Sequence, residues 1–335
     1  ARGMMWLGTQ SGLLRFDGYR FRRFKHEPDN PASLSGDFVQ SLAIDRTGRI
    51  WVGTESDGLA VLDPQTERFR RFRHDPTNVN SIGPGPVHAL AMAADGAMWV
   101  AADVGLVSMD LGADHFVRRF VEHQQGDAAL RVQSLLFAHD GSLWVGARDG
   151  LLHRAPGEQI PRRFATVGGN ALDGREISKL FEASDGRLWI GTHEHGAAVL
   201  DPIHGTLQWI GAGNAATADL GLAWINAIAQ PTPDEIWLSR FGKGMLIVDA
   251  ISGDVRHVMQ NDPGMTSGLG FDAIGDLFVD RNGLLWVGTW GGGLQRHNPR
   301  NQAISSLRHS TTLPQHLSHP SVLRLLELHD GRILA

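Results

Sequence analysis

The sequence predicts an all-β protein, a seven-bladed β-propeller of four-stranded antiparallel blades. A tryptophan-centred motif recurs at near-constant spacing, and tight Asp/Gly turns follow short apolar runs in the repeats. Repeats of about 40–50 residues built from short β-rich runs are typical of propellers. A helical solenoid would instead need apolar positions at i, i+3 and i+4 over about ten or more residues, and no such stretch is present.

The repeated motif reads Trp-Val-Gly-Thr in its most regular form. Seven copies are present, and their tryptophans lie 45, 48, 45, 45, 48 and 49 residues apart. These framework tryptophans are Trp6, Trp51, Trp99, Trp144, Trp189, Trp237 and Trp286. Large aromatic side chains at such regular spacing predict a core that packs between neighbouring blades.

Each repeat contains four β-rich runs in the same order. The first is an apolar run such as Val39 to Ile44 or Val132 to Phe137, and a turn such as Asp45 to Gly48 follows it. In such turns aspartate accepts hydrogen bonds from the backbone, and glycine adopts positive φ at no steric cost. The second run carries the framework tryptophan, and the third is apolar, as in Gly58 to Leu62.

The fourth run has an Arg-Arg-Phe signature in four repeats: Arg22 to Phe24, Arg70 to Phe72, Arg118 to Phe120 and Arg162 to Phe164. An aromatic residue facing the next blade, with charges turned to water, would protect an exposed outer edge strand. Basic and aromatic residues also alternate in nucleic-acid-binding surfaces, but a formal charge of −5 gives no overall attraction to a polyanion. We therefore expect edge strands and no nucleic-acid partner.

The two ends of the chain are expected to close the ring. Residues 1–25 supply the second to fourth runs of a blade, and residues 321–328 are predicted to form its missing first strand. A single propeller over residues 1–335 follows, with the C-terminal strand completing the N-terminal blade. Because Arg332 to Ala335 begin another second run, we expect a fragment of a longer receptor.

Composition and motifs exclude several kinds of site. The chain has no cysteine, which excludes disulfides and thiolate chemistry and is compatible with an oxidising compartment. No Gly-x-Ser-x-Gly elbow, His-Glu-x-x-His, P-loop or dinucleotide fingerprint is present. No run approaches the ~18 consecutive apolar residues of a membrane span. We therefore expect no cofactor and no catalytic residues, and membrane attachment only through a helix outside this chain.

The repeats resemble those of the two-component-regulator propeller family. The family hallmark reads approximately Asp-x-x-Gly-x-Leu-Trp-Ile-Gly-Thr-x-x-x-Gly-Leu, and Asp45 to Leu59, Asp185 to Gly196 and Asp280 to Leu294 are similar to it. A second family segment, His-Asp-Pro-x-Asn-x-x-Ser-Leu, resembles His26 to Leu34 and His74 to Ile82. The resemblance covers essentially the whole chain.

This resemblance implies a periplasmic input domain of a bacterial membrane receptor, with a histidine kinase or diguanylate cyclase as the output module elsewhere. It implies ligand sensing rather than catalysis, and several family members are associated with carbohydrates. Blade six departs most from the pattern, since Pro231 to Glu235 replace the usual turn and Ser239-Arg240 replace Gly-Thr.

Loop residues that differ between repeats are the candidates for binding. Loops between the second and third strands share one face of a propeller with the connections between blades, and binding sites concentrate on such loops. The predicted ligand-binding residues are Glu55, Asp103, Arg148, His193, His195, Arg240, Lys243 and Trp290. An aromatic ring beside forked donors and carboxylates suits a saccharide or a uronic acid. Alternatively, these residues are solvated loop tips.

Other interpretations stay open at the level of sequence. His193 and His195 would need a third ligand, such as Glu55 or Asp149, to hold a metal, and none is identified, so no metal is predicted. A protein-interaction or homodimerisation platform needs no small ligand. A propeller lyase or hydrolase would use His193 or His195 as its catalytic group. Finally, Ile203 to Ile225, with Trp209 and Trp224, are expected to form an enlarged connection, either a lid or a surface loop.

Overall fold

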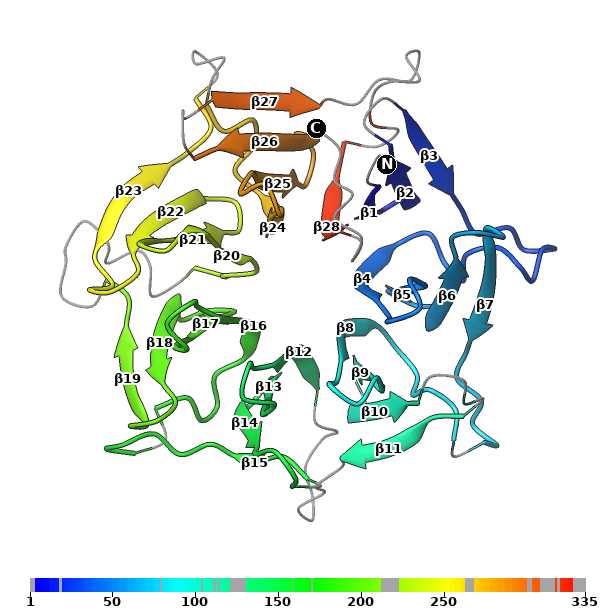
Figure 1. Cartoon of the computed structure of the whole chain (residues 1–335), viewed down its shortest axis with the longest axis horizontal. Helices are drawn as coiled ribbons and strands as arrows, with labels where there is room; N and C mark the ends of the chain where they lie inside the picture. Colours follow the sequence, from blue (N-terminus) through cyan, green and yellow to red (C-terminus); the bar gives the residue numbers. More distant parts are fainter. Residues whose placement is uncertain are drawn as a thin grey trace.

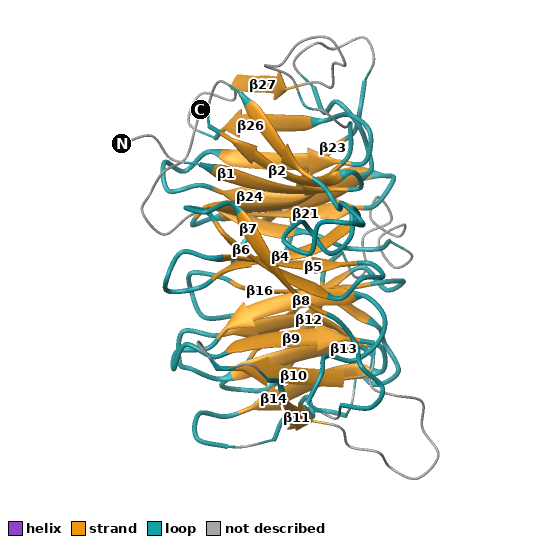
Figure 2. Ribbon diagram, turned by 90° about the vertical axis from the view of Figure 1, so that its right-hand side faces the viewer, coloured by secondary structure: helices purple, strands orange, loops and turns teal. Residues whose placement is uncertain are grey.

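The computed structural model describes residues 4–17, 20–78, 80–103, 105–110, 113, 115–120, 131–158, 160–169, 171–211, 223–262, 268–299, 303–307, 317 and 320–327. Within these residues, the strands form seven antiparallel four-stranded sheets arranged as blades around a central axis (Figure 1). This arrangement confirms the predicted seven-bladed β-propeller. Seen from the side, loops project on both sides of the ring (Figure 2). No helix in the described ranges has the length and apolarity needed to cross a membrane.

The first strand of each repeat lies closest to the axis, and the second strand carries the framework tryptophan. In order from blade one to blade seven, the innermost strands are β28 (Val322–Glu327), β4 (Val39–Ile44), β8 (Val87–Met92), β12 (Val132–Phe137), β16 (Ile177–Glu182), β20 (Ile228–Thr232) and β24 (Ile274–Val279). The second strands are β1 (Met5–Thr9), β5 (Ile50–Thr54), β9 (Met98–Ala102), β13 (Leu143–Ala147), β17 (Leu188–Thr192), β21 (Glu235–Arg240) and β25 (Leu285–Thr289).

The third and fourth strands complete each blade toward the rim. The third strands are β2 (Gly12–Phe16), β6 (Leu59–Asp63), β10 (Gly105–Met109), β14 (Gly150–Arg154), β18 (Ala197–Asp201), β22 (Gly244–Asp249) and β26 (Leu294–Asn298). The outermost strands are β3 (Phe21–Phe24), β7 (Arg68–Phe72), β11 (Val117–Phe120), β15 (Arg162–Arg163), β19 (Thr206–Trp209), β23 (Val255–Met259) and β27 (Ala303–Leu307). The Arg-Arg-Phe runs therefore lie on edge strands, as the sequence predicts.

The C-terminal strand closes the ring. β28 pairs antiparallel with β1, from Met5 opposite Glu327 to Thr9 opposite Val322, so blade one combines both ends of the chain. The predicted strand, residues 321–328, is one residue longer at its start than β28, because Ser321 instead makes an isolated bridge with Trp290. Residues 328–335, including the expected start of a further repeat, lie outside the described residues.

The Asp/Gly turns reverse the chain, and some of their aspartates also bond to the tryptophan of the strand that follows. In blade two, the Asp45 carboxylate accepts the Thr47 backbone N–H at 2.9 Å, and Gly48 has a φ of 84°. The second oxygen of Asp45 accepts the indole N–H of Trp51 at 2.9 Å. Asp280 and Trp286 repeat this indole bond in blade seven at 2.7 Å. The turn is therefore linked directly to the core.

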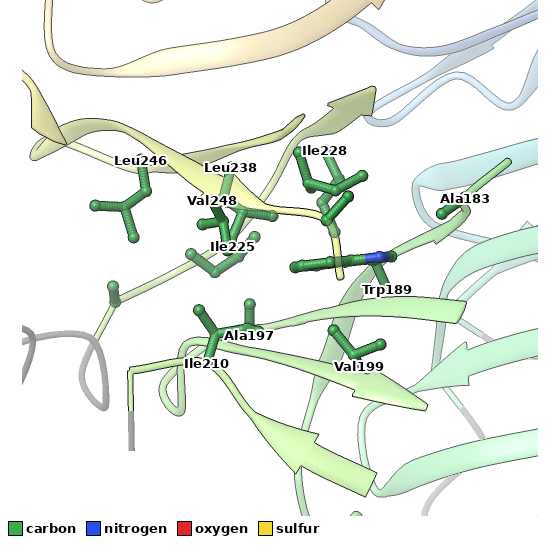
Figure 3. Packing of buried hydrophobic residues seen from close by; sticks show 13 residues of the cluster. Ala183, Trp189, Ala197, Val199, Ile210, Ile225, Ile228, Leu238, Leu246 and Val248 are labelled. Carbon is green, nitrogen blue, oxygen red and sulfur yellow. The ribbon is translucent and has the colours of Figure 1, made fainter. Parts of the chain in front are cut away.

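Each framework tryptophan packs against the blade that follows its own. Trp189 of blade five, for example, is fully buried between Val199 of the same blade and Ile228 and Leu238 of blade six (Figure 3). The corresponding clusters contain Trp6, Trp51, Trp99, Trp144, Trp237 and Trp286, each with residues of the next blade. The core of this protein is thus a set of inter-blade layers, as the spacing predicts.

The glycine of the repeated motif allows neighbouring inner strands to approach closely. A β-carbon added at Gly53 would lie 2.2 Å from the Ser41 hydroxyl oxygen and 2.5 Å from a methyl carbon of Val87 in blade three. Gly191 is similarly close to Ile225. The Trp-x-Gly signature therefore reflects two packing requirements, an inter-blade tryptophan and a position without a side chain.

The connection between blades five and six differs from the expectation. Residues Thr206–Trp209 form β19, the outermost strand of blade five, and Trp209 pairs with Ala198. Trp209 is therefore part of the repeat frame, and the predicted enlargement of residues 203–225 was wrong in its first part. Residues 212–222, where a lid or surface loop was expected, lie outside the described residues.

Candidate functional site

The loops after the second strands and the connections into the innermost strands share one face, here called the loop face. In each case below, the residue after the second strand donates its backbone N–H to a carbonyl oxygen in the segment that leads into the inner strand of the same blade. The pairs are Glu55 with Phe38 (3.0 Å), Arg148 with Arg131 (2.9 Å), His193 with Glu176 (3.0 Å), Phe241 with Trp224 (2.9 Å) and Trp290 with Ala273 (2.8 Å). Side chains from two segments of each blade therefore meet at the same level of the ring.

A threonine closes most of these loops, and Arg240 takes its place in blade six. The hydroxyls of Thr54, Thr192 and Thr289 donate to the carbonyl oxygens of the loop glycines at 2.8–2.9 Å. Arg240 occupies the corresponding end of β21, and its guanidinium donates to the Lys243 carbonyl at 2.9 Å. Arg240 is only 6% exposed. The expectation that Arg240 presents its side chain on the loop face is therefore corrected: it is buried and stabilises its own loop.

Five aromatic rings form a continuous series across the loop face. The ring of His193 lies 5.0 Å from that of Trp224, which lies 4.7 Å from that of Phe241. Phe241 meets Trp290 edge-on at 5.6 Å, and Trp290 lies 6.2 Å from Phe38. All five are partly exposed. We call these residues the aromatic arc; it joins blades five, six, seven and two on one face.

The aromatic arc contains two predicted site residues, His193 and Trp290, and three that the sequence did not single out as site residues. Phe38 directly precedes the inner strand β4, Trp224 lies in the segment that leads into β20, and Phe241 directly follows the second strand β21. Alignment of the repeats on their tryptophans places these residues at loop positions that vary between blades. That variation was the available signal for them.

The other predicted site residues lie around the same face with different partners. The Glu55 carboxylate accepts a hydrogen bond from the Gln40 side chain, and Asp103 lies 2.8 Å from Nε2 of His88. The side chains of Arg148 and His195 are exposed, and Lys243 is half-buried. Their exposure is compatible with a contact to a ligand. Glu55 and Asp103 belong to blades two and three, whereas the arc centres on blades five to seven.

Polar side chains of the innermost strands line a central channel with a volume of about 500 Å³. Several of them bond to backbone carbonyl oxygens of the next inner strand or of the segment that leads into it. The hydroxyl of Ser41 donates to the Val87 carbonyl at 2.8 Å, that of Ser178 to Ile225 at 2.5 Å, and the Asn226 amide to Ile274 at 2.7 Å. These bonds satisfy backbone groups that an inner sheet edge otherwise leaves to water.

The described residues contain no group of three or more metal-ligating side chains in a suitable arrangement. His193 and His195 therefore have no third ligand within the described part of the chain. The imidazole Nδ1 of His193 lies 3.8 Å from a carboxylate oxygen of the adjacent Glu194, and its side chain is 42% exposed.

The repeats of this propeller match a known family in sequence. The profile described as "two component regulator propeller" matches residues 33–56, 171–194 and 268–291. Each matched segment contains the inner strand and the tryptophan strand of one blade, namely blade two, five or seven. The chain therefore carries repeats of the two-component regulator propeller family, and the resemblance stated above is confirmed. No curated protein matches the chain by sequence.

Solved structures share the fold at low sequence identity. YCF48 bound to D1 peptide aligns with a TM-score of 0.62 and 15% identity, over 92% of this chain and 91% of that one. Virginiamycin B lyase from Staphylococcus aureus gives a TM-score of 0.58 and 14% identity, over 80% and 83% of the two chains. The extracellular domain of the putative hybrid two component system BT3049 from B. thetaiotaomicron gives 0.46 and 17% identity, over 93% and 52%. This chain thus spans about half the length of that domain.

Proposed function

We propose that this chain is a ligand-sensing input module of a bacterial signal-transduction receptor, outside the cytoplasm, and that it binds a saccharide on the aromatic arc. The family supports the sensing role, because the matched repeats are those of two-component regulator propellers. The same family resemblance supports an extracytoplasmic location, which is compatible with a chain that has no cysteine. The observation that carries the choice of ligand is the aromatic arc.

Partly exposed aromatic rings suit the apolar C–H faces of a sugar, while neighbouring polar groups bind its hydroxyls. In this chain each ring of the arc packs against the next, so the rings are held in place before a ligand arrives. A preorganised surface loses less conformational entropy on binding than a mobile one. His193 lies at one end of the arc, and Lys243 follows Phe241 in the same loop. These polar groups would orient the sugar on the rings.

A closed ring of inter-blade layers resists deformation, and this suggests how binding is transmitted. We propose that a bound ligand changes how the loop face docks against a second propeller, in a homodimer or in a longer parent, without changing the ring itself. Small-angle scattering of the parent receptor's extracytoplasmic part, with and without ligand, would then differ. Identical profiles at saturation would contradict this mode of transmission.

A thermal-shift screen tests the proposed ligand class. The panel contains neutral mono- and oligosaccharides, uronic acids, amino acids and divalent metal ions. A ligand that binds only the folded state stabilises it by about 2.7 kcal/mol at a hundredfold excess over Kd. We expect a saturable increase in Tm with at least one saccharide. If no saccharide shifts Tm at millimolar concentration, the loop face is better explained as a protein-interaction platform.

A further inference from the structure

Three charged side chains meet in the wall of the central channel, on inner strands and not in the loops that carry the predicted site residues. Lys179 on β16 and Asp276 on β24 form an ion pair of 3.5 Å, although they belong to blades five and seven. Arg324 on β28, in blade one, lies beside them and also lines the channel. The charge cluster therefore connects three blades, including the strand that closes the ring.

The repeat does not require charge at these positions. Arg324, Lys179 and Asp276 each pair with the motif glycine of their own blade, namely Gly8, Gly191 and Gly288. The equivalent residues of blades two and four are Ser41 and Ser134, opposite Gly53 and Gly146. Those serines are sufficient for the hydrogen bond to the next blade. The charges are thus additions to the framework.

The cluster contains one more positive charge than negative charge. Asp276 accepts the backbone N–H of Leu325 at 3.0 Å and pairs with Lys179, so its carboxylate is already engaged twice. Arg324 donates through Nη1 to the carbonyl oxygens of Leu323 (2.6 Å) and Gly275 (3.5 Å). Among the described residues, the remaining guanidinium donors have no hydrogen-bond partner. A guanidinium has five N–H donors and stays protonated.

Arg324 is half-buried in the channel wall, and a charge that is partly removed from water is stabilised by groups that pair with it. Burial lowers the pKa of the Arg324 guanidinium, and the Asp276 carboxylate opposes that effect only in part. The channel offers about 500 Å³ in front of this group. That volume lies within the range of about 300–1,000 Å³ of small-molecule sites. An anion of one negative charge would complete the charge balance there.

We propose that the channel is a binding site for a small carboxylate, with Arg324 as the forked donor and Lys179 as the second cation. Guanidinium and carboxylate match in geometry, since two parallel N–H groups meet two oxygens. The amide of Gln133 and the hydroxyl of Ser178 also line the channel and supply neutral polar groups. Because Arg324 lies on β28, the bound carboxylate stabilises closure of the ring.

The channel site and the aromatic arc are neighbours with separate chemistry. A β-carbon added at Gly275 would lie 3.2 Å from the indole nitrogen of Trp290, and the carbonyl of the same glycine accepts from Arg324. Trp290 therefore lies at the loop-face end of the channel. A free carboxylic acid would use the channel alone, whereas an acidic sugar would reach both sites.

Thermal unfolding with sodium acetate and sodium glucuronate, each against sodium chloride at equal ionic strength and pH 7, tests the proposal. We expect both carboxylates to raise Tm saturably in the wild-type chain and in the control Arg162→Gln. Arg162 is exposed on the outer strand β15, so this control removes the same charge outside the channel. The shift should be lost in Arg324→Gln. An equal shift in Arg324→Gln, or none in the wild type, would overturn the proposal.

Arg324→Lys covers the case in which Arg324→Gln does not fold. It keeps the charge and removes the fork, so acetate affinity should fall at least tenfold, and an unchanged affinity would contradict the proposal. Trp290→Ala separates the two sites. Acetate binding should survive in Trp290→Ala, and binding of a neutral saccharide should survive in Arg324→Lys. Loss of acetate binding in Trp290→Ala would mean that the carboxylate binds at the arc and not in the channel.

Discussion

The ring of Trp290 lies 6.2 Å from the ring of Phe38, although one residue follows the second strand of blade seven and the other precedes the inner strand of blade two. The contact crosses blade one, the blade that both chain ends complete. Two rings from distant repeats thus support each other at the loop-face end of the channel. The orientation of Trp290 depends on Phe241 on one side and Phe38 on the other.

Phe38→Ala is expected to weaken saccharide binding without removing it. An aromatic pair contributes about 0.5–1.5 kcal/mol beyond its buried area, so the loss of support for Trp290 should reduce affinity about two- to twelvefold. Isothermal titration with the strongest saccharide of the panel measures the change. Phe21→Ala is the matched control, because Phe21 stacks on Phe16 at 4.4 Å on the outer strand of blade one. Equal losses in both variants would contradict a role for Phe38 in the arc.

Asp45→Ala is expected to lower the free energy of unfolding by about 1–3 kcal/mol, because the buried indole N–H of Trp51 loses its acceptor. The matched control is Asp185→Ala in blade five. Asp185 makes the same turn bond to a backbone N–H, at 3.0 Å, but Trp189 has no hydrogen-bond partner for its indole nitrogen within the described residues. Urea denaturation should show the smaller loss for Asp185→Ala. A larger loss in the control would refute the indole bond as the cause.

The stability of this protein is expected to fall between pH 7.5 and pH 5, in part because of His297. Burial lowers the pKa of His297, and the nearby Glu235 carboxylate only partly offsets this. The ring packs 5.0 Å from Trp237 and is 9% exposed. The folded state therefore favours neutral imidazole. The contribution of neutral His297 to the free energy of unfolding is complete above the unfolded pKa of about 6.5. It is lost as pH falls toward the folded pKa, by about 1.4 kcal/mol for each unit between the folded and unfolded pKa.

His297→Phe removes this titration and should flatten the dependence of unfolding free energy on pH over that interval. The control is His257→Gln, because His257 is exposed on the outer strand β23. Urea denaturation at pH 7.5, 6.0 and 5.0 gives the three slopes. The account requires the wild type and His257→Gln to share one slope and His297→Phe to have a smaller one. The same slope in all three proteins would show that His297 does not titrate on unfolding.

Periodicity made most of the fold predictable. The framework tryptophans recur at near-constant spacing in all seven blades, so the strand order, the inter-blade packing of Trp189 and the edge position of the Arg-Arg-Phe runs all followed from one repeat. The closing strand β28 was predictable because the N-terminal blade lacked its first run. Trp209 was misplaced because blade five has Thr206 to Trp209 where blades one to four have Arg-Arg-Phe, and the change of residue type hid the outer strand.

The site was less predictable, because it depends on contacts between repeats. Lys179 and Asp276 are 97 residues apart, and only the closed ring brings them to 3.5 Å. Phe38 belongs to the arc because it meets Trp290 across blade one. Arg240 was predicted as a ligand-binding residue of the loop, yet it replaces the threonine that closes the loop. Charge and variability in sequence do not show on which side of a backbone a side chain packs.

The affinity of Trp290→Ala for the strongest saccharide of the panel tests the central claim most directly. Trp209→Ala is the control, because Trp209 is a partly exposed tryptophan on the outer strand of blade five, with Arg175 over its ring at 4.8 Å. The account predicts at least a tenfold loss of affinity by isothermal titration in Trp290→Ala, about 1.4 kcal/mol, and unchanged affinity in Trp209→Ala. Unchanged affinity in Trp290→Ala, with the fold intact by circular dichroism, would show that the aromatic arc is not the saccharide site.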